Sequence, residues 1–273
     1  MIPVEMTSNG PDMDTVERLV SADTAVKGIW CVPKYSNPQG ITYSDETVRR
    51  FAALKPAAPD FRIYWDNAYC VHDLTGVPDR LLNLYDECRK AGNENLPVIF
   101  ASTSKISFPG AGLAVMASSV ENLSWDRKRI AAQTIGPDKL NQLRHLKYFG
   151  NVQGIRAQMQ KHRAILQPKF EAVLHMLERE LSGTGALSWT HPNGGYFISV
   201  DTLDGCAKRV VALCKEAGVV LTSAGATYPY GKDPKDRNIR IAPTFPPVGE
   251  LLQAMELFCL CVKIATLEKL LGA

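Results

Sequence analysis

Hydrophobic and polar positions in the first half of the chain alternate between short apolar runs and helical patterns. The apolar runs predict strands at residues 26–32, 62–66, 97–102 and 112–118. Between them, Ser44 opens a helix with an acidic first turn, and residues 79–91 form a second helix that ends at Gly92. Strands that are apolar along their whole length are typical of a sheet covered on both faces, so the pattern predicts an α/β fold with a mostly parallel sheet.

The pattern changes after residue 137. Apolar residues recur at steps of three and four over 138–181, which predicts a long helix that Pro168 kinks or divides. An α+β segment follows, with strands at 195–200, 218–221 and 238–242 and helices at 205–217 and 248–271. We therefore expect two domains, residues 1–155 and 156–273, with the boundary inside the long helix.

Composition narrows the class of protein. The 273 residues are 45% hydrophobic, enough for a sizeable core and two lobes, and 31 basic against 28 acidic residues leave a net charge of +3. That mixed surface does not indicate a nucleic-acid partner, and no apolar run is long enough to predict a membrane span. The N-terminus lacks the features of a secretion signal, and seven scattered cysteines indicate reduced thiols, so we expect a cytoplasmic protein.

Four short motifs carry chemistry, and they occur in a fixed order. They are centred on Asn37 in SNPQG, Asp66 in DNAY, Lys105 in ASTSKIS and Arg240 in NIRI. The first three follow predicted strands, and ligands of α/β sheets gather at the carboxyl ends of strands. An amine, a carboxylate, phenolic-oxygen contacts and a guanidinium are the groups that a pyridoxal phosphate (PLP) site requires. The five histidines form no ligand pair, and we predict no metal site.

With these motifs the chain resembles the fold-type I PLP-dependent aminotransferases of class I/II, and is most similar to a bacterial aspartate-aminotransferase-like subgroup. The resemblance extends to residues 192–197 (PNGGYF) and 223–228 (SAGATY). It implies part of a large PLP-binding domain followed by a small C-terminal α+β domain. It also implies a homodimer that moves an amino group from an amino acid, with aspartate expected, to a 2-oxo acid, with 2-oxoglutarate expected.

The resemblance also assigns roles at the cofactor. Lys105 would hold PLP as a Schiff base and, once released, would move the proton during the reaction. Asp66 would bind the pyridine nitrogen and keep it protonated, because an adjacent opposite charge favours the charged form. Tyr69 and Asn37 would bond to the phenolic oxygen of the ring. Ser102 and Ser104 would contact the phosphate.

At the substrate, the resemblance makes Arg240 the clamp on the α-carboxylate, through a two-pronged hydrogen bond that a lysine does not form. Asn37 would contact the substrate as well. Two features depart from the family. Position 113 is Leu where the family has an Arg that binds the cofactor phosphate, and Ser107 is the substitute for that contact. The N-terminal part of the family's large domain has no counterpart here. The chain therefore reads as truncated, and we expect the isolated chain to have little or no activity.

Three other interpretations remain open at this point. The same fold serves as the ligand-sensing domain of transcription regulators, and as the scaffold of other PLP reactions such as β-elimination or decarboxylation. The chain also fits a remnant that binds no cofactor. Phosphate-loop, dinucleotide and serine-hydrolase motifs are not matched: residues 225–232 have the wrong spacing, 110–112 lack the third glycine, and no GxSxG occurs.

Overall fold

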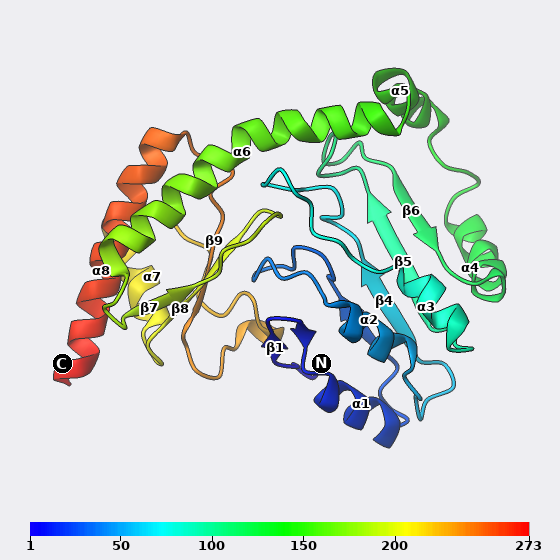
Figure 1. Ribbon diagram of the computed structural model, residues 1–273, viewed down its shortest axis with the longest axis horizontal. Helices are drawn as coiled ribbons and strands as arrows, with labels where there is room; N and C mark the ends of the chain where they lie inside the picture. Colours follow the sequence, from blue (N-terminus) through cyan, green and yellow to red (C-terminus); the bar gives the residue numbers. More distant parts are fainter. Residues whose placement is uncertain (273) are drawn as a thin grey trace.

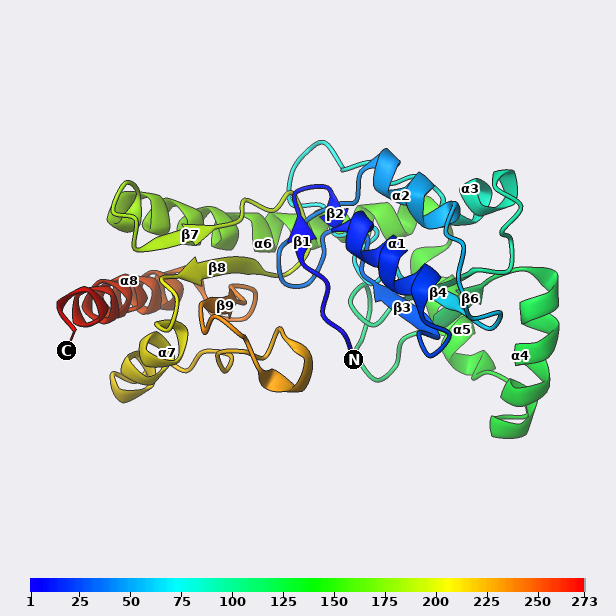
Figure 2. The same ribbon diagram turned by 90° about the horizontal axis from the view of Figure 1, so that it is seen from below.

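The computed structural model, which describes residues 1–272, consists of two lobes connected by a long helix (Figure 1). The first lobe contains a four-stranded sheet with helices α1 to α5, and the second contains a three-stranded sheet with α7 and α8. The helix α6 (Val152–Leu181) runs past both (Figure 1). Seen from below, the lobes lie side by side along the long axis (Figure 2). The domain limit at 155/156 falls inside α6 and stays a prediction.

The sheet of the first lobe is mostly parallel, as the apolar runs predict. Its strands lie in the order β3 (Gly28–Cys31), β4 (Arg62–Asp66), β5 (Pro97–Ser102) and β6 (Ala114–Ala117). The first three are parallel and β6 is antiparallel to β5. The carboxyl ends of β3, β4 and β5 therefore meet at one edge, which is where parallel sheets place their ligands.

Three helices cover one face of this sheet: α1 (Met13–Ala22), α2 (Asp45–Ala52) and α3 (Leu84–Lys90). Phe51, Ile63 and Trp65 are buried between helices and sheet. The Ser44 side chain accepts a hydrogen bond from the Thr47 amide and so caps α2 at the predicted start. The helix predicted over 79–91 begins later, at α3, because Asn83 supplies the N-terminal cap. Sequence patterns did not reveal α1.

The other face of the sheet carries an open aromatic stack. The rings of Trp30, Tyr64 and Phe100 lie parallel to one another, with centroids 5.9 to 6.4 Å apart. Trp30 is 64% exposed, and no helix among residues 1–272 buries it. A stack of this size at the surface leaves an apolar patch in contact with water.

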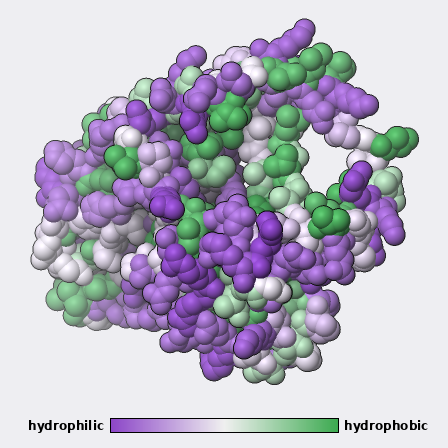
Figure 3. All heavy atoms as spheres, turned by 45° about the vertical axis from the view of Figure 1, so that its right-hand side comes forward, coloured by the Kyte–Doolittle hydropathy of each residue, from purple (hydrophilic) through white to green (hydrophobic). Residues whose placement is uncertain are grey.

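Beyond β6, a helix that the sequence did not predict comes first, and the region 138–181, predicted as one helix, is two helices separated by one break. The first of these is α4 (Val120–Gln133); the predicted region itself consists of α5 (Lys139–Phe149) and α6, with α5 capped by Gly150, whose φ is 68°. Pro168 lies inside α6 and does not divide it, against one of the two predicted outcomes, because the flanking turns pack on the second core. When the right-hand side of Figure 1 is turned toward the viewer, the surface shows an opening bordered by both hydrophobic and hydrophilic residues (Figure 3).

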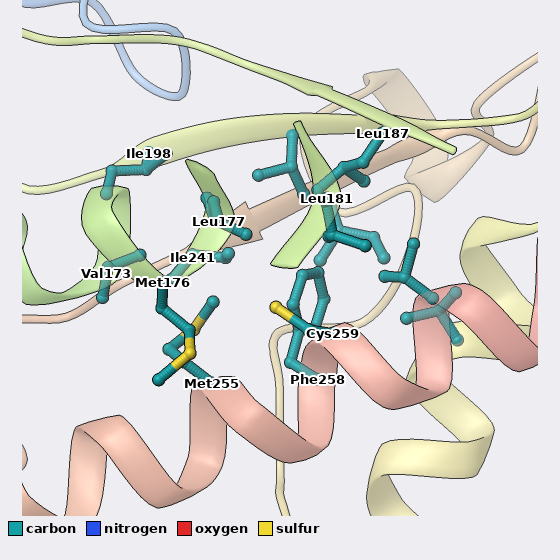
Figure 4. Packing of buried hydrophobic residues seen from close by; sticks show 14 of the residues in the cluster. Val173, Met176, Leu177, Leu181, Leu187, Ile198, Ile241, Met255, Phe258 and Cys259 are labelled. Carbon is teal, nitrogen blue, oxygen red and sulfur yellow. The ribbon is translucent and has the colours of Figure 1, made fainter. Parts of the chain in front are cut away.

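The second lobe is an antiparallel sheet packed on two long helices. Its strands lie in the order β7 (Leu187–Trp189), β8 (Ile198–Thr202) and β9 (Asn238–Ile241). Along the chain, α7 (Ala207–Glu216) lies between β8 and β9, and α8 (Val248–Leu271) follows β9. Figure 4 shows residues of α6, α8 and the sheet meeting in one core around Phe258, Leu177 and Ile198, each with no exposed surface.

One predicted strand is not formed. Residues 218–221 form a loop, with Val220 exposed, because no neighbouring strand is available to pair with them. At the N-terminus, only β1 (Met6–Thr7) is extended, and it pairs with β2 (Gly10–Pro11) in a short hairpin. A single 3₁₀ turn, η1 (Pro229–Gly231), precedes β9. Among the described residues, none of the helices has the length and apolar character needed to cross a bilayer.

Candidate functional site

The two lobes meet at a seam where main chain lies directly against side chains. A Cβ added at Gly40 would lie 2.4 Å from Pro192, and one added at Gly194 would lie 2.3 Å from the ring of Tyr35. Both distances are far inside van der Waals contact, so each glycine permits the approach. The main chain continues the seam, because Leu74 donates to the Asn193 carbonyl over 2.8 Å and Gly195 to that of His72 over 2.9 Å.

A buried ion pair lies behind this seam. Lys34 and Tyr35 are buried, and the Lys34 amine lies 3.2 Å from Asp73 Oδ1. The Tyr35 hydroxyl donates to the same oxygen over 2.5 Å, and Lys34 also donates to the Cys70 carbonyl over 3.1 Å. A buried ammonium is tolerated when it is paired and hydrogen-bonded in this way. The network fixes the loops that follow β3 and β4, which carry Asn37 and Tyr69.

Lys105 and Tyr69 meet at the carboxyl edge of the parallel strands. Lys105 lies in the turn after β5, and its amine is 5.1 Å from the centroid of the Tyr69 ring. Asp66 is the last residue of β4 and pairs with Phe100 of β5. Burial raises the pKa of Tyr69 to about 12, and the carboxylate of Asp66 adds to the rise while Arg240 opposes it. The phenol therefore keeps its proton at neutral pH and can donate a hydrogen bond.

Arg240 and Asn37 meet across the seam. Arg240 lies on β9 opposite Ser199, and its Nη1 donates to Asn37 Oδ1 over 3.1 Å. The guanidinium carbon is 4.4 Å from the ring centroid of Phe197. Arg240 Nε is buried and has no hydrogen-bond partner within the described chain. A buried guanidinium N–H without a partner is costly, and a carboxylate is the ligand that this fork-shaped donor fits best.

The serines near Lys105 divide into two sets. Ser102 and Ser104 lie together, with the Ser104 amide donating to Ser102 Oγ over 3.4 Å. Ser107 faces helix α5 instead, because its hydroxyl oxygen lies 2.7 Å from His145 Nε2. The Leu113 amide donates a hydrogen bond to Thr103 Oγ1 over 2.8 Å, and the leucine side chain carries no positive charge for a phosphate. Ser107 is thus occupied by His145, which weighs against it as a substitute for the family's arginine.

Two residues to which the sequence assigned no role contact Lys105. His72 Nε2 lies 3.0 Å from the Lys105 carbonyl oxygen, and the Tyr196 hydroxyl donates to the same oxygen over 3.0 Å. Burial lowers the pKa of His72 to about 4, so its ring is neutral at pH 7. Tyr196 belongs to the PNGGYF segment, which carried the resemblance without a role for this side chain, and His72 belongs to no motif. Only the folded chain brings the two residues to Lys105.

The structure therefore brings the predicted residues together as two pairs, Lys105 with Tyr69 and Arg240 with Asn37. The rings of Tyr196 and Phe197 lie between the pairs, 5.8 and 6.4 Å from that of Tyr69. Asp66 is linked to this group through its electrostatic effect on Tyr69, and no hydrogen bond joins it to Lys105 in residues 1–272. No group of three or more His, Cys, Asp or Glu in the described part of the chain is arranged to hold a metal ion.

Relatives that share about half of their aligned residues with this chain are aminotransferases, by name. The family model described as aspartate amino-transferase matches residues 1–273. An aspartate aminotransferase of Corynebacterium glutamicum is 47% identical over 268 residues, which are 98% of this chain and 62% of that protein. The crystal structure of an aspartate transaminase from the same organism superposes with a TM-score of 0.96 at 47% identity, covering 98% of this chain and 63% of the other.

A more distant structure has the same fold. The α-aminoadipate aminotransferase of Thermus thermophilus, complexed with N-(5′-phosphopyridoxyl)-L-leucine, gives a TM-score of 0.78 at 20% identity and covers 97% of this chain and 65% of the other. The fold is thus that of the fold-type I enzymes, as the sequence predicts. The chain spans a little under two thirds of the length of the first relatives it matches.

Proposed function

We propose, because the chain belongs to the aspartate amino-transferase family, that its site binds PLP and serves the transfer of an amino group between an amino acid and a 2-oxo acid. The observation that carries the proposal is the unpartnered, buried Nε of Arg240 beside Asn37, at a site that also holds Lys105 against Tyr69. A carboxylate clamp and a reactive amine within one site suit an amino-acid substrate.

The residues present fit most of the cofactor. Lys105 would hold its aldehyde carbon through Nζ, Asp66 would pair with the ring nitrogen, and the protonated Tyr69 would donate to the phenolic oxygen. Asn37 has its amide nitrogen free for the same purpose, because its oxygen accepts from Arg240. Bound PLP would supply a protonated ring that withdraws electrons from the substrate carbon. For the phosphate, Ser102 and Ser104 are the candidates, and the arginine of the family has no equivalent at Leu113.

Within the reaction, each side chain has a task that its surroundings support. Arg240 would bind the α-carboxylate through Nε and an Nη, and thereby orient the carbon that loses its proton. The amine of Lys105, once free of the cofactor, would accept that proton and return it at another carbon. The aromatic rings of Tyr69, Tyr196 and Phe197 would exclude water from the space around the amine.

We further propose aspartate and 2-oxoglutarate as the substrate pair, because the relatives named above are aspartate aminotransferases. A homodimer is part of the same proposal, on the family resemblance alone. The chain spans about 62% of the length of this relative, so amino-group transfer by the chain and binding of PLP or substrate are two separate measurements.

The cofactor is tested by reduction. The purified chain is incubated with PLP, treated with borohydride and digested, and we expect one pyridoxyl phosphate group on the peptide that contains Lys105. Lys105→Ala should lose that label, while Lys27→Ala, which alters an exposed lysine, should retain it. Label spread evenly over surface lysines would contradict the proposal.

The carboxylate clamp is tested by calorimetry with aspartate. Arg240→Gln should weaken binding about tenfold or more, the factor expected for a lost charge-assisted hydrogen-bond pair. Arg209→Gln, which alters an arginine on α7 paired with Glu268, serves as the matched control and should leave the affinity unchanged. Equal affinities of the two variants would refute the role of Arg240.

A further inference from the structure

The main-chain carbonyl of Lys105 is held by two side chains. His72 Nε2 and the Tyr196 hydroxyl each lie 3.0 Å from this oxygen. A carbonyl oxygen only accepts, so the proton of the His72 ring resides on Nε2 and both contacts are donated to Lys105. His72 Nδ1 is consequently an unprotonated, buried nitrogen, and it has no partner in the described chain.

The two donors come from different lobes. His72 is three residues beyond Tyr69, in the loop after β4 of the first lobe, and Tyr196 is two residues before β8 of the second. Their rings are packed edge to face, with centroids 5.2 Å apart, and the ring of Tyr69 contacts both. The pair therefore forms at the seam, where neither lobe alone supplies both hydrogen bonds.

The turn that carries Lys105 does not bind this oxygen through its own main chain. Ile106 and Ser107 both donate their amides to the Thr103 carbonyl, over 2.9 and 2.7 Å. No main-chain amide of residues 1–272 donates to the Lys105 oxygen. The orientation of the Lys105 peptide unit, and with it the direction of the side chain, thus depends on His72 and Tyr196.

We propose that His72 and Tyr196 are positioning residues that hold Lys105 by its main-chain carbonyl, one from each lobe, so that the closeness of the lobes sets the direction of the reactive amine. The functional part of this inference rests on the proposed role of Lys105, and the hydrogen-bonding part stands without it. A shift of the second lobe that takes Tyr196 away would leave the carbonyl with one donor and loosen the turn.

The test measures amide hydrogen exchange at residues 103–107 in the cofactor-free full chain. Tyr196→Phe removes one hydroxyl and His72→Phe one N–H, and both keep a ring of similar size. Each should accelerate exchange of the Ile106 amide about fivefold, the effect of one lost hydrogen bond. His72→Gln, whose amide nitrogen can donate from a similar position, should restore slow exchange. Tyr148→Phe, which removes a tyrosine hydrogen bond on α5, should change nothing at residue 106.

A second measurement concerns PLP. The positioning variants should also lower the yield of borohydride-fixed label on Lys105 at limiting PLP, while Tyr148→Phe should not. Unchanged exchange in both Phe variants, or acceleration spread equally over β9 and α8, would overturn the inference. A complete lack of label in the unaltered chain would refute the PLP proposal instead, and it would leave the exchange result to decide the positioning role.

Discussion

The sheets of the two lobes differ in how their faces are covered. In the second lobe, the sheet packs on α6 and α8 around Phe258, which has no exposed surface. In the first lobe, α1 to α3 cover one face, and the other carries the stack of Trp30, Tyr64 and Phe100. Along the strand RIYWD, Ile63 and Trp65 are buried under these helices, whereas Arg62, Tyr64 and Asp66 alternate with them and stay partly exposed. The second lobe therefore has the more completely buried sheet.

The largest expected effect contrasts an aromatic residue in each lobe. Phe258→Ala removes a fully buried ring and should lower the free energy of unfolding by about 4 kcal/mol, since it leaves a cavity that α6 and α8 cannot close. Trp30→Ala should cost less than about 1 kcal/mol, because that ring is 64% exposed. Urea unfolding followed by circular dichroism measures both. Equal losses would mean that the open stack is buried in solution.

The next effect concerns the network behind the seam. Asp73→Ala leaves the Lys34 ammonium buried without its carboxylate, and should destabilise the chain by about 3 kcal/mol. The double variant Lys34→Met and Asp73→Ala removes both charges and should regain most of that loss, because no uncompensated charge remains. Thermal unfolding of the single and double variants tests this. A double variant as unstable as Asp73→Ala would show that packing, rather than charge, dominates there.

A pH effect of somewhat smaller size is expected from His72. Its pKa falls from 6.5 to about 4 on folding because burial disfavours the charged ring, with the nearby His162 and the Lys105 amine adding to the fall. The unfolded chain therefore binds more protons between these values. Stability from this group is full above pH 6.5 and declines as the pH falls toward 4, by about 2–3 kcal/mol in total.

His72→Phe should flatten that part of the pH–stability curve, and urea unfolding at a series of pH values measures it. His162→Phe is the comparison, because burial also lowers the pKa of His162, to a smaller extent. A curve of unchanged slope in His72→Phe would mean that the ring is charged in the folded chain.

The smallest effect on stability is expected at the open stack, where the readout is dye binding. Trp30→Glu should reduce the fluorescence of bound ANS, a dye that reports exposed apolar surface, while the free energy of unfolding changes by only about 0.5 kcal/mol. Val77→Glu alters an exposed apolar residue of a loop and is the control. If the dye signal stays the same in Trp30→Glu, the stack is not the accessible patch.

The sequence predicted elements well where the apolar pattern was continuous. β4, β5 and α8 have the predicted bounds because their runs are uninterrupted and end at clear breakers. The run at 218–221 has the same composition and forms a loop, since strand formation depends on a partner that a local pattern does not report. For α1, the short apolar stripe of Met13, Val16 and Val20 is visible mainly once its burial is known.

At the site, the sequence predicted those residues that lie in recognisable motifs. Lys105, Tyr69, Arg240 and Asn37 could be named because their chemistry and order suit one ligand, and they lie in two contacting pairs. Their roles remain predictions until a ligand is bound. His72 and Tyr196 could not be found this way, because they act on a main-chain oxygen 33 and 91 residues away in sequence.

Helix α6 gives the site a dependence on residues that do not touch it. Arg163 donates to the Thr75 carbonyl of the first lobe over 3.0 Å, and Lys169 donates to that of Thr244 in the second over 2.8 Å. Between these two hydrogen bonds the helix keeps a fixed rise and rotation per residue. Inserting one residue would therefore rotate its far end by about 100° and advance it by about 1.5 Å. Arg240 would then move away from Asn37, and Tyr196 would move away from Lys105. The number of residues in α6 between these two contacts therefore matters to the geometry of the site as much as the side chains that form it.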